Sequence, residues 1–119
     1  MLLPFIIGRF FRFSNYGRNN GLENDSEDLS GTNTLFGIKN KKLNIKTLYF
    51  YGFGSGIETF SLPERYKPSH IIYFPLFVIG DKSVYICKID TVGTCTIYTE
   101  GFYEKADSTK QYYGAISYF

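Results

Sequence analysis

The sequence predicts an all-β domain, and three observations support this prediction. Phe and Tyr are abundant, with 12 Phe and 11 Tyr among 119 residues, and aromatic residues fit the half-buried surface of a pleated sheet. Several short stretches alternate with period two, most clearly at 42–53, which includes Thr47, Tyr49 and Tyr51. The 12 glycines can supply the turns that many short strands require. At this length we expect a single domain spanning 1–119.

The expected strands are read from the apolar and alternating stretches in chain order. They lie at 2–13, 34–38, 42–53, 57–62, 69–79, 83–90, 94–99 and 112–119. Two long polar stretches, 14–33 and 101–110, are predicted to be loops. Seven or eight short strands with regular turns favour an antiparallel β-sandwich of jelly-roll-like type.

Proline positions refine this prediction because proline cannot donate to a strand ladder. Pro63 and Pro68 bracket a connection that is predicted not to be a strand. Pro75 lies within 69–79, the most apolar strand, and predicts a bulge or an edge position there. Turns are expected at 52–56, 80–81 and 90–93, where glycines cluster with polar residues.

The first 13 residues are apolar but do not resemble a targeting segment. Pro4 interrupts them, and Arg9 and Arg12 follow the apolar stretch, whereas a signal peptide carries its positive charges first. The stretch is also too short to span a bilayer. We expect residues 1–13 to form an initial strand or the connection to an upstream region, with no membrane insertion.

Charge and cysteine content exclude several classes of partner. The formal net charge is only +2, and the short run Lys39, Lys41 and Lys42 is typical of a solvated turn, so no nucleic-acid partner is expected. With one His and no Cys-x-x-Cys, no metal site and no cofactor are predicted. Cys87 and Cys95 flank a predicted turn, and we expect free, buried thiols on adjacent strands in a reducing cytoplasm.

Candidate catalytic groups are few. Ser69 and His70 are adjacent, so in a strand they would point to opposite faces. Glu100 and Glu104 could form the carboxylate pair of a glycoside hydrolase, although nothing in the sequence sets their separation. We therefore predict no catalytic residue, and a small hydrolase remains the alternative.

Two loop motifs have weaker functional interpretations. The glycines of 52–56 lack the following helix of a phosphate-binding loop. The acidic stretch with Glu23, Asp25, Glu27 and Asp28 could bind Ca²⁺ but lacks the ligand spacing of an EF-hand, so a solvated loop is expected.

Tyrosines suggest a binding surface. Many of the 11 Tyr must lie at the surface or at an interface, where a rigid ring offers contact area at low entropy cost. The best candidate surface is near the polar loop at 101–110, and its tyrosines are Tyr98, Tyr103, Tyr112, Tyr113 and Tyr118.

Two phrases in the sequence resemble a known class of proteins. The first runs from Phe60 to Ser69 and continues into an apolar strand that begins with His70, and the second is Gly114–Phe119. Together they are similar to phrases of bacteriophage tail-fibre and baseplate proteins, over about residues 45–119. One departure is Glu64-Arg65, where such proteins commonly have a glycine before the aromatic residue.

The resemblance implies a virion domain assembled in the host bacterial cytoplasm. Such domains usually follow a longer fibre, form homotrimers and contact other virion proteins. They either bind a saccharide receptor on the host cell surface or serve as a structural trimerising cap or a decoration domain. A small polysaccharide-degrading enzyme is the third possibility. The residues expected to contact a ligand are Tyr103, Glu104, Asp107 and Tyr112.

Overall fold

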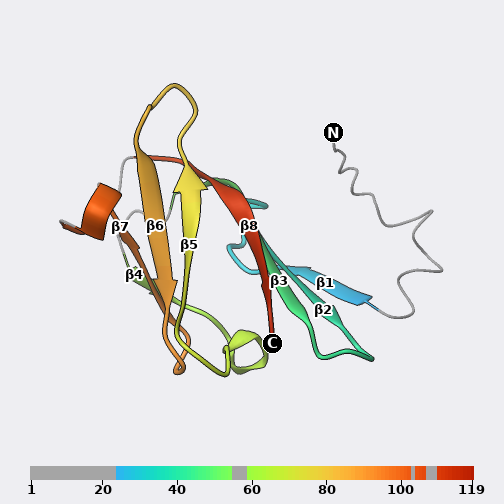
Figure 1. The fold of residues 1–119 in the computed structure, drawn as a ribbon. Helices are drawn as coiled ribbons and strands as arrows, with labels where there is room; N and C mark the ends of the chain where they lie inside the picture. The colour runs from blue at the N-terminus through green and yellow to red at the C-terminus, as the bar shows by residue number, and fades with distance from the viewer. Residues whose placement is uncertain (1–23, 55–58, 103, 107–109) are drawn as a thin grey trace.

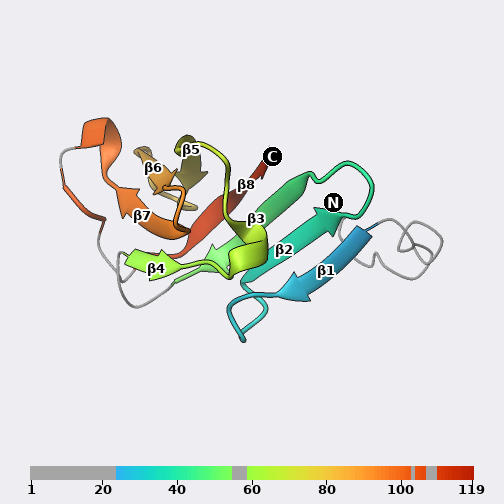
Figure 2. The same cartoon turned by 90° about the horizontal axis from the view of Figure 1, so that it is seen from below.

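The computed structural model describes residues 24–54, 59–102, 104–106 and 110–119. They form eight antiparallel strands in one curled sheet, in the order β1-β2-β3-β8-β5-β6-β7-β4 (Figures 1 and 2). The described residues contain almost no helix, so the predicted all-β class is confirmed. The expected strand at 2–13 lies outside the described residues.

The bounds of the strands agree with most of the predicted ranges. They are β1 (Asn24–Asp28), β2 (Leu35–Asn40), β3 (Lys46–Phe53), β4 (Thr59–Ser61), β5 (Ile72–Phe77), β6 (Val84–Ile89), β7 (Thr94–Tyr98) and β8 (Tyr112–Tyr118). Two short 3-10 helices, η1 (Glu64–Tyr66) and η2 (Glu100–Phe102), interrupt the connections.

Strand β1 lies inside the stretch that the sequence predicts to be a loop. Its residues are all polar, but they pair antiparallel with β2 from Asn24↔Asn40 to Asp28↔Phe36. An edge strand can be polar because only one side of it is covered by another strand. Ion pairs hold two of the β1 side chains in place. Asp25 pairs with Lys41 at 3.4 Å, and Glu27 pairs with Arg65 of η1.

Strand β3 starts at Lys46, four residues later than predicted. The side chain of Asn40 explains the difference because its Oδ1 accepts the backbone N–H groups of Lys42 and Leu43, at 2.9 and 2.8 Å. This turn is completed by Asn44 with a φ of 55°. An asparagine that bonds the backbone two or three residues further on favours a turn over a strand.

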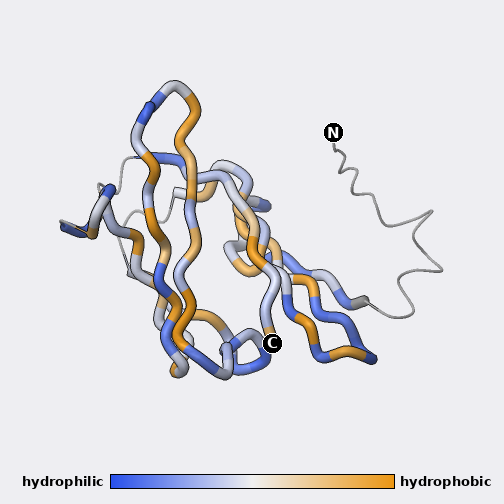
Figure 3. The backbone as a smooth tube through the Cα atoms, in the orientation of Figure 1, coloured by the Kyte–Doolittle hydropathy of each residue, from blue (hydrophilic) through white to orange (hydrophobic). Residues whose placement is uncertain are grey.

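The sheet curls around its own core. Apolar residues alternate along the strands (Figure 3), and the inward-facing ones meet inside the curl. The buried apolar side chains are Leu35, Leu48, Phe50, Phe53, Leu62, Tyr66, Phe74, Leu76, Tyr85, Cys87, Ile89, Cys95, Ile97, Ala106, Tyr112 and Tyr118. Cys87 on β6 and Cys95 on β7 are free thiols on adjacent strands, as predicted for their placement.

Strands β5 and β8 join the two halves of the sheet through one register pair, Phe77↔Tyr113. Pro75 lies in β5 without breaking its register with β6, so its missing N–H faces the β8 side. The two backbones approach closely there because Gly114 has no side chain, and a Cβ at Gly114 would lie 2.8 Å from Leu76 Cδ2. The predicted bulge or edge position of Pro75 is therefore wrong, because β5 lies between β8 and β6 in unbroken register with β6, and the weakly paired seam with β8 accommodates the proline.

The connection between Pro63 and Pro68 is not a strand, as predicted, and it fastens η1 to the first half of the sheet. The Tyr118 hydroxyl donates to the Tyr66 carbonyl at 2.5 Å, and Lys46 Nζ donates to the Lys67 carbonyl at 3.2 Å. Lys46 is buried, and burial followed by the charge of Lys39 lowers its pKa. The connection therefore packs against β3 and β8.

Candidate functional site

A shallow groove of about 570 Å³ lies on the outer face of the sheet, away from the core. Its walls are Tyr73 of β5, Lys88 of β6, Tyr98 of β7 and Phe102 of η2. The strand register brings the first two side by side, because Tyr73 pairs with Lys88. About half of the surface of Tyr73 and Phe102 is exposed, 54% and 48%. The groove is therefore lined by three aromatic rings and one amine.

The ring of Phe102 contacts both of the groove tyrosines. Phe102 stands perpendicular to Tyr73, with ring centroids 5.5 Å apart, and tilts against Tyr98 at the same distance. Such edge-to-face and tilted geometries are those that aromatic pairs prefer. The rings are consequently held in position before any ligand arrives, which lowers the entropy cost of binding.

The loop that carries Phe102 is closed by backbone bonds. Thr99 N–H donates to the Glu104 carbonyl at 2.8 Å, Phe102 N–H to the Thr99 carbonyl at 2.9 Å, and Ala106 N–H to the Ile97 carbonyl at 2.8 Å. Phe102 has a φ of 62°, in the left-handed region that a bulky residue rarely adopts. Backbone strain of this kind persists where the surroundings enforce it, and it clusters at binding sites.

The groove can bind a ligand that has an apolar face and polar edges. The faces of Tyr73, Tyr98 and Phe102 offer apolar contact, and the tyrosine hydroxyls remain available to water or ligand. Lys88 forms no ion pair with any residue that the structure describes, so its amine can donate to hydroxyl or carboxylate oxygens. A saccharide ring combines these properties.

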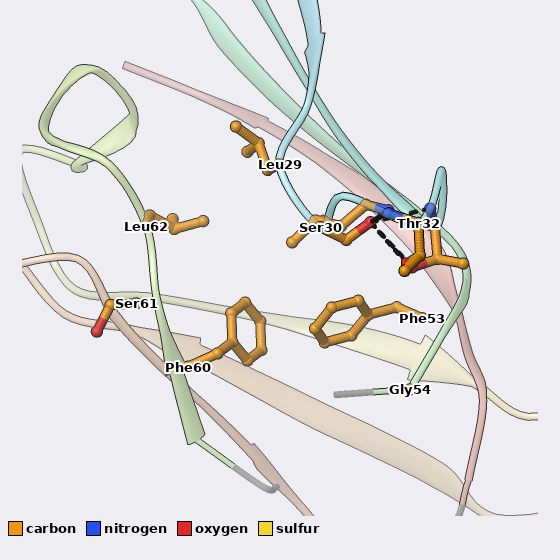
Figure 4. A pocket seen from close by; sticks show the side chains of 10 residues that line it. Leu29, Ser30, Thr32, Phe53, Gly54, Phe60, Ser61 and Leu62 are labelled. Carbon is orange, nitrogen blue, oxygen red and sulfur yellow. Dashed lines mark hydrogen bonds between the residues drawn. The ribbon is translucent and has the colours of Figure 1, made fainter. Parts of the chain in front are cut away.

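A second hollow, of about 330 Å³, lies where the β1–β2 loop approaches the end of β3 and strand β4 (Figure 4). Phe53 and Phe60 point toward each other across it, with ring centroids 4.7 Å apart. On the opposite wall the hydroxyls of Thr32 and Thr34 each donate to Ser30 Oγ at 3.1 Å. Because these hydroxyls already bond one another, this hollow offers a ligand mainly apolar contact.

The residues predicted to contact a ligand are placed in different environments. Tyr103 and Asp107 lie outside the described residues. Glu104 is exposed in the same loop as Phe102, and its N–H donates to Thr99 Oγ1 at 3.2 Å. Tyr112 is buried, only 3% exposed, and its ring contacts Tyr85 inside the curl.

Of the five tyrosines of the predicted surface, the four that the structure describes do not form one surface. Tyr98 lines the groove, and Tyr113 faces outward on β8, where its ring contacts Tyr51 at 5.7 Å. Tyr112 and Tyr118 are buried. Strand alternation separates them, since Tyr112 and Tyr113 are adjacent and must point to opposite faces of β8.

Ser69 and His70 are closer than the sequence suggests. Ser69 Oγ lies 3.1 Å from His70 Nδ1, because both residues precede β5 in a bend and strand alternation does not apply to them. The prediction that they cannot pair was therefore wrong. Both are exposed, and they line neither of the two hollows described above.

The described residues contain no group of three His, Cys, Asp or Glu side chains that could hold a metal ion. In the acidic stretch, Asp25 and Glu27 are engaged by Lys41 and Arg65, whereas Asp28 accepts four hydrogen bonds from its own loop. Glu23 lies outside the described residues. In the part of the chain that the structure describes, no helix has the length and apolar character needed to cross a membrane.

Tyr73, Lys88 and Phe102 are groove residues that the sequence reasoning missed. One signal for Tyr73 was present: in Ile72–Phe77 it alternates with Phe74 and Leu76, so one face of this apolar strand had to point outward. Phe102 carried no such signal, because its position depends on the left-handed backbone of Gly101 and Phe102. The chain matches no protein-family model and no curated protein.

Proposed function

We propose that this chain is a bacteriophage fibre or baseplate module that binds a saccharide of the host cell surface, without catalytic activity. The observation that carries the proposal is the outer groove, with its three pre-packed rings and the amine of Lys88. The two phrases of the sequence that resemble tail-fibre proteins add the virion context. The proposal includes a jelly-roll-like homotrimer that is assembled in the bacterial cytoplasm and contacts other virion proteins.

The stretch 60–69, which resembles tail-fibre proteins, has a structural role in this domain: it helps to keep the fold rigid. Leu62, Tyr66 and Pro68 are buried, and the connection that they form is fastened to β3 and β8. In this proposal the phrase maintains the domain, while the groove on the opposite face of the sheet supplies the ligand contacts.

A glycan array that displays bacterial surface saccharides tests the proposal. The unaltered chain should bind one class of saccharide, and Tyr73→Ala or Phe102→Ala should weaken that binding by roughly fivefold, since an aromatic contact contributes about 1 kcal/mol. Leu43→Ala is the matched control, because Leu43 is exposed in the β2–β3 turn. Binding that survives both groove substitutions would disprove the site.

A second candidate function is a purely structural trimerising cap or decoration domain. The observation in its favour is the number of large apolar side chains that remain exposed, including Tyr51, Phe77 and Ile79. Clustered exposed apolar side chains are typical of a face that another protein covers. A silent array, together with a stable oligomer, would favour the cap over the receptor-binding module.

A further inference from the structure

A row of four aromatic rings crosses the outer face of β2, β3 and β8. We call Phe36, Tyr49, Tyr51 and Tyr113 the aromatic ladder. Its ring centroids are 6.4, 6.2 and 5.7 Å apart in that order. The strand register explains the row, because Phe36 pairs with Tyr49 and Tyr51 pairs with Tyr113. The ladder is therefore a continuous apolar surface outside the core.

The ladder continues across the seam of the sheet. Tyr113 pairs with Phe77 of β5, and Phe77 and Tyr51 are 51% and 59% exposed. Exposed large apolar side chains that adjoin one another in this way are unusual on a monomer, where they are scattered singly. This apolar surface extends from the ladder onto β5, the strand that also carries Tyr73, but the groove residues are not part of it.

The face that carries the ladder is nearly free of charge. The described strands contain six charged residues: Asp25, Glu27, Asp28, Lys39, Lys46 and Lys88. Four of them share the inner side, since Asp25 pairs with Lys39, Lys39 with Lys46, and Glu27 with Gly37. Only Asp28 and Lys88 remain outside. Soluble surfaces are about 25–35% charged, whereas the centre of an interface is depleted of charge and enriched in aromatic residues.

Polar groups beside the ladder already have partners. Thr47 Oγ1 and Ser117 Oγ are 2.8 Å apart, in a hydrogen bond between β3 and β8. The carboxylate of Asp28 accepts the N–H groups of Ser30, Gly31 and Asn33 at 3.0–3.1 Å, as well as the Ser30 hydroxyl. A protein that covered this face would leave few polar groups without a bond.

We propose that a second copy of this chain covers the aromatic ladder. A charged partner, such as a nucleic acid, an anionic membrane or an acidic peptide, would lose hydration on this face without gaining an opposite charge. The same face of another copy is matched in charge, because Asp28, beside Phe36, is the one charged strand residue next to the ladder and its carboxylate already accepts four hydrogen bonds. A two-fold axis brings the same surface of both copies into contact, and a three-fold axis turns the same face of each copy toward the axis.

This inference rests on the proposed assembly and names the face that forms it. The groove residues Tyr73, Lys88, Tyr98 and Phe102 lie on β5–β7 and η2, so they stay outside the contact over β2, β3 and β8. Each copy in the assembly would therefore present its own groove. Several grooves on one assembly raise the overall affinity for a surface that displays many saccharides.

Light scattering coupled to size-exclusion chromatography, with the full chain, tests the ladder. The unaltered chain should have two or more times the mass of one copy. Tyr51→Glu should shift it to monomer by raising the dissociation constant at least about a hundredfold, which corresponds to burying a charge without a partner. Leu43→Glu, an equally exposed apolar-to-acidic change in the β2–β3 turn, should leave the mass unchanged.

Ala115→Arg is a second ladder variant, because Ala115 is exposed on β8 and pairs with Tyr49. Circular dichroism confirms that each variant is folded. A monomeric unaltered chain, or an oligomer that survives both folded ladder variants, would overturn the inference. Saccharide binding by a monomeric chain would contradict the ladder interface and leave the receptor-binding function standing. An oligomer that Tyr51→Glu dissociates, with no binding on the glycan array, would support the ladder interface and contradict the receptor-binding function.

Discussion

The ring of Tyr66 lies against the backbone of Gly37 so closely that position 37 has no room for a side chain. A Cβ at Gly37 would stand 2.7 Å from both Cε1 and the hydroxyl oxygen of Tyr66. Tyr66 belongs to η1, and Gly37 is in the middle of β2. An aromatic ring thus covers the one inward position of β2 that has no side chain of its own, and this contact holds the η1 connection on the sheet.

Gly37→Ala should destabilise the fold by about 1–3 kcal/mol, because the ring of Tyr66 must move to admit one methyl group. Urea unfolding, followed by circular dichroism, measures the loss. In a Tyr66→Leu background the same change should cost distinctly less, since the smaller side chain leaves space. An equal cost in both backgrounds would show that the two residues are not coupled.

Glu27→Gln should reduce stability at neutral pH but not in acid. The hydrogen bonds from Arg65 hold the pKa of Glu27 below its usual value of 4.5. A lowered pKa in the folded state gives stability that is present above pH 4.5 and is lost as the pH falls through the folded value. The pair is partly exposed, so we expect a difference below about 1 kcal/mol.

Urea unfolding of the unaltered chain and of Glu27→Gln at pH 7 and at pH 3 measures this difference. The two curves should separate at pH 7 and come together at pH 3. Asp25→Asn is a useful comparison on the same strand, because Asp25 pairs with Lys41 at 3.4 Å in a more exposed position. A separation that is unchanged at pH 3 would contradict the prediction.

Tyr66→Phe should make the fold more resistant to alkali. Burial, followed by the charge of Glu27, raises the pKa of Tyr66 above its usual value of 10.0. The stability that comes from the neutral phenol is complete below pH 10 and is lost as the pH rises above it, because only the unfolded chain ionises readily. The hydroxyl is buried without a hydrogen-bond partner among the described residues, so its removal should cost little at neutral pH. Unfolding measured from pH 8 to 12 should show a shallower fall for Tyr66→Phe, and an identical fall would refute the prediction.

Cys87 and Cys95 should not react with a thiol reagent while the chain is folded. Both are fully buried, and a hydrogen bond with Cys87, together with burial, raises the pKa of the Cys95 thiol. The thiolate is the reactive form, so burial opposes the reaction at both thiols, and the raised pKa opposes it further at Cys95. Ellman's reagent should detect both thiols in guanidinium chloride and neither in buffer; rapid reaction of the folded chain would contradict this placement.

The strands that could be predicted from the sequence are those whose two faces differ in polarity. β3 and β5–β8 alternate between buried and exposed positions, and their turns contain glycine or aspartate. β1 could not be predicted in this way, because Asn24–Asp28 has no apolar residue to mark a face. It is held by backbone pairing with β2 and by an ion pair with Arg65, which lies far away in the chain.

The groove was only partly predictable. The described residues of the polar stretch 101–110 belong to no strand, in agreement with the predicted loop, and the groove lies beside them. The three-ring contact was not predictable, since it combines a strand residue, Tyr73, with Phe102 in a strained turn. Sequence spacing carries no information about a left-handed φ at an aromatic residue, and the partner of each ring is set by the curl of the whole sheet.

The place of β8 in the sheet has a consequence for how the chain folds during synthesis. β8 follows all the other strands in the chain, yet it lies between β3 and β5, and Thr47 bonds Ser117 across 70 residues. The ribosome therefore releases the seven other described strands before the one that joins them. Contacts of such long range slow folding, roughly to milliseconds or seconds, and leave strand edges exposed meanwhile. The nascent chain should depend on chaperones until Tyr112–Tyr118 has emerged.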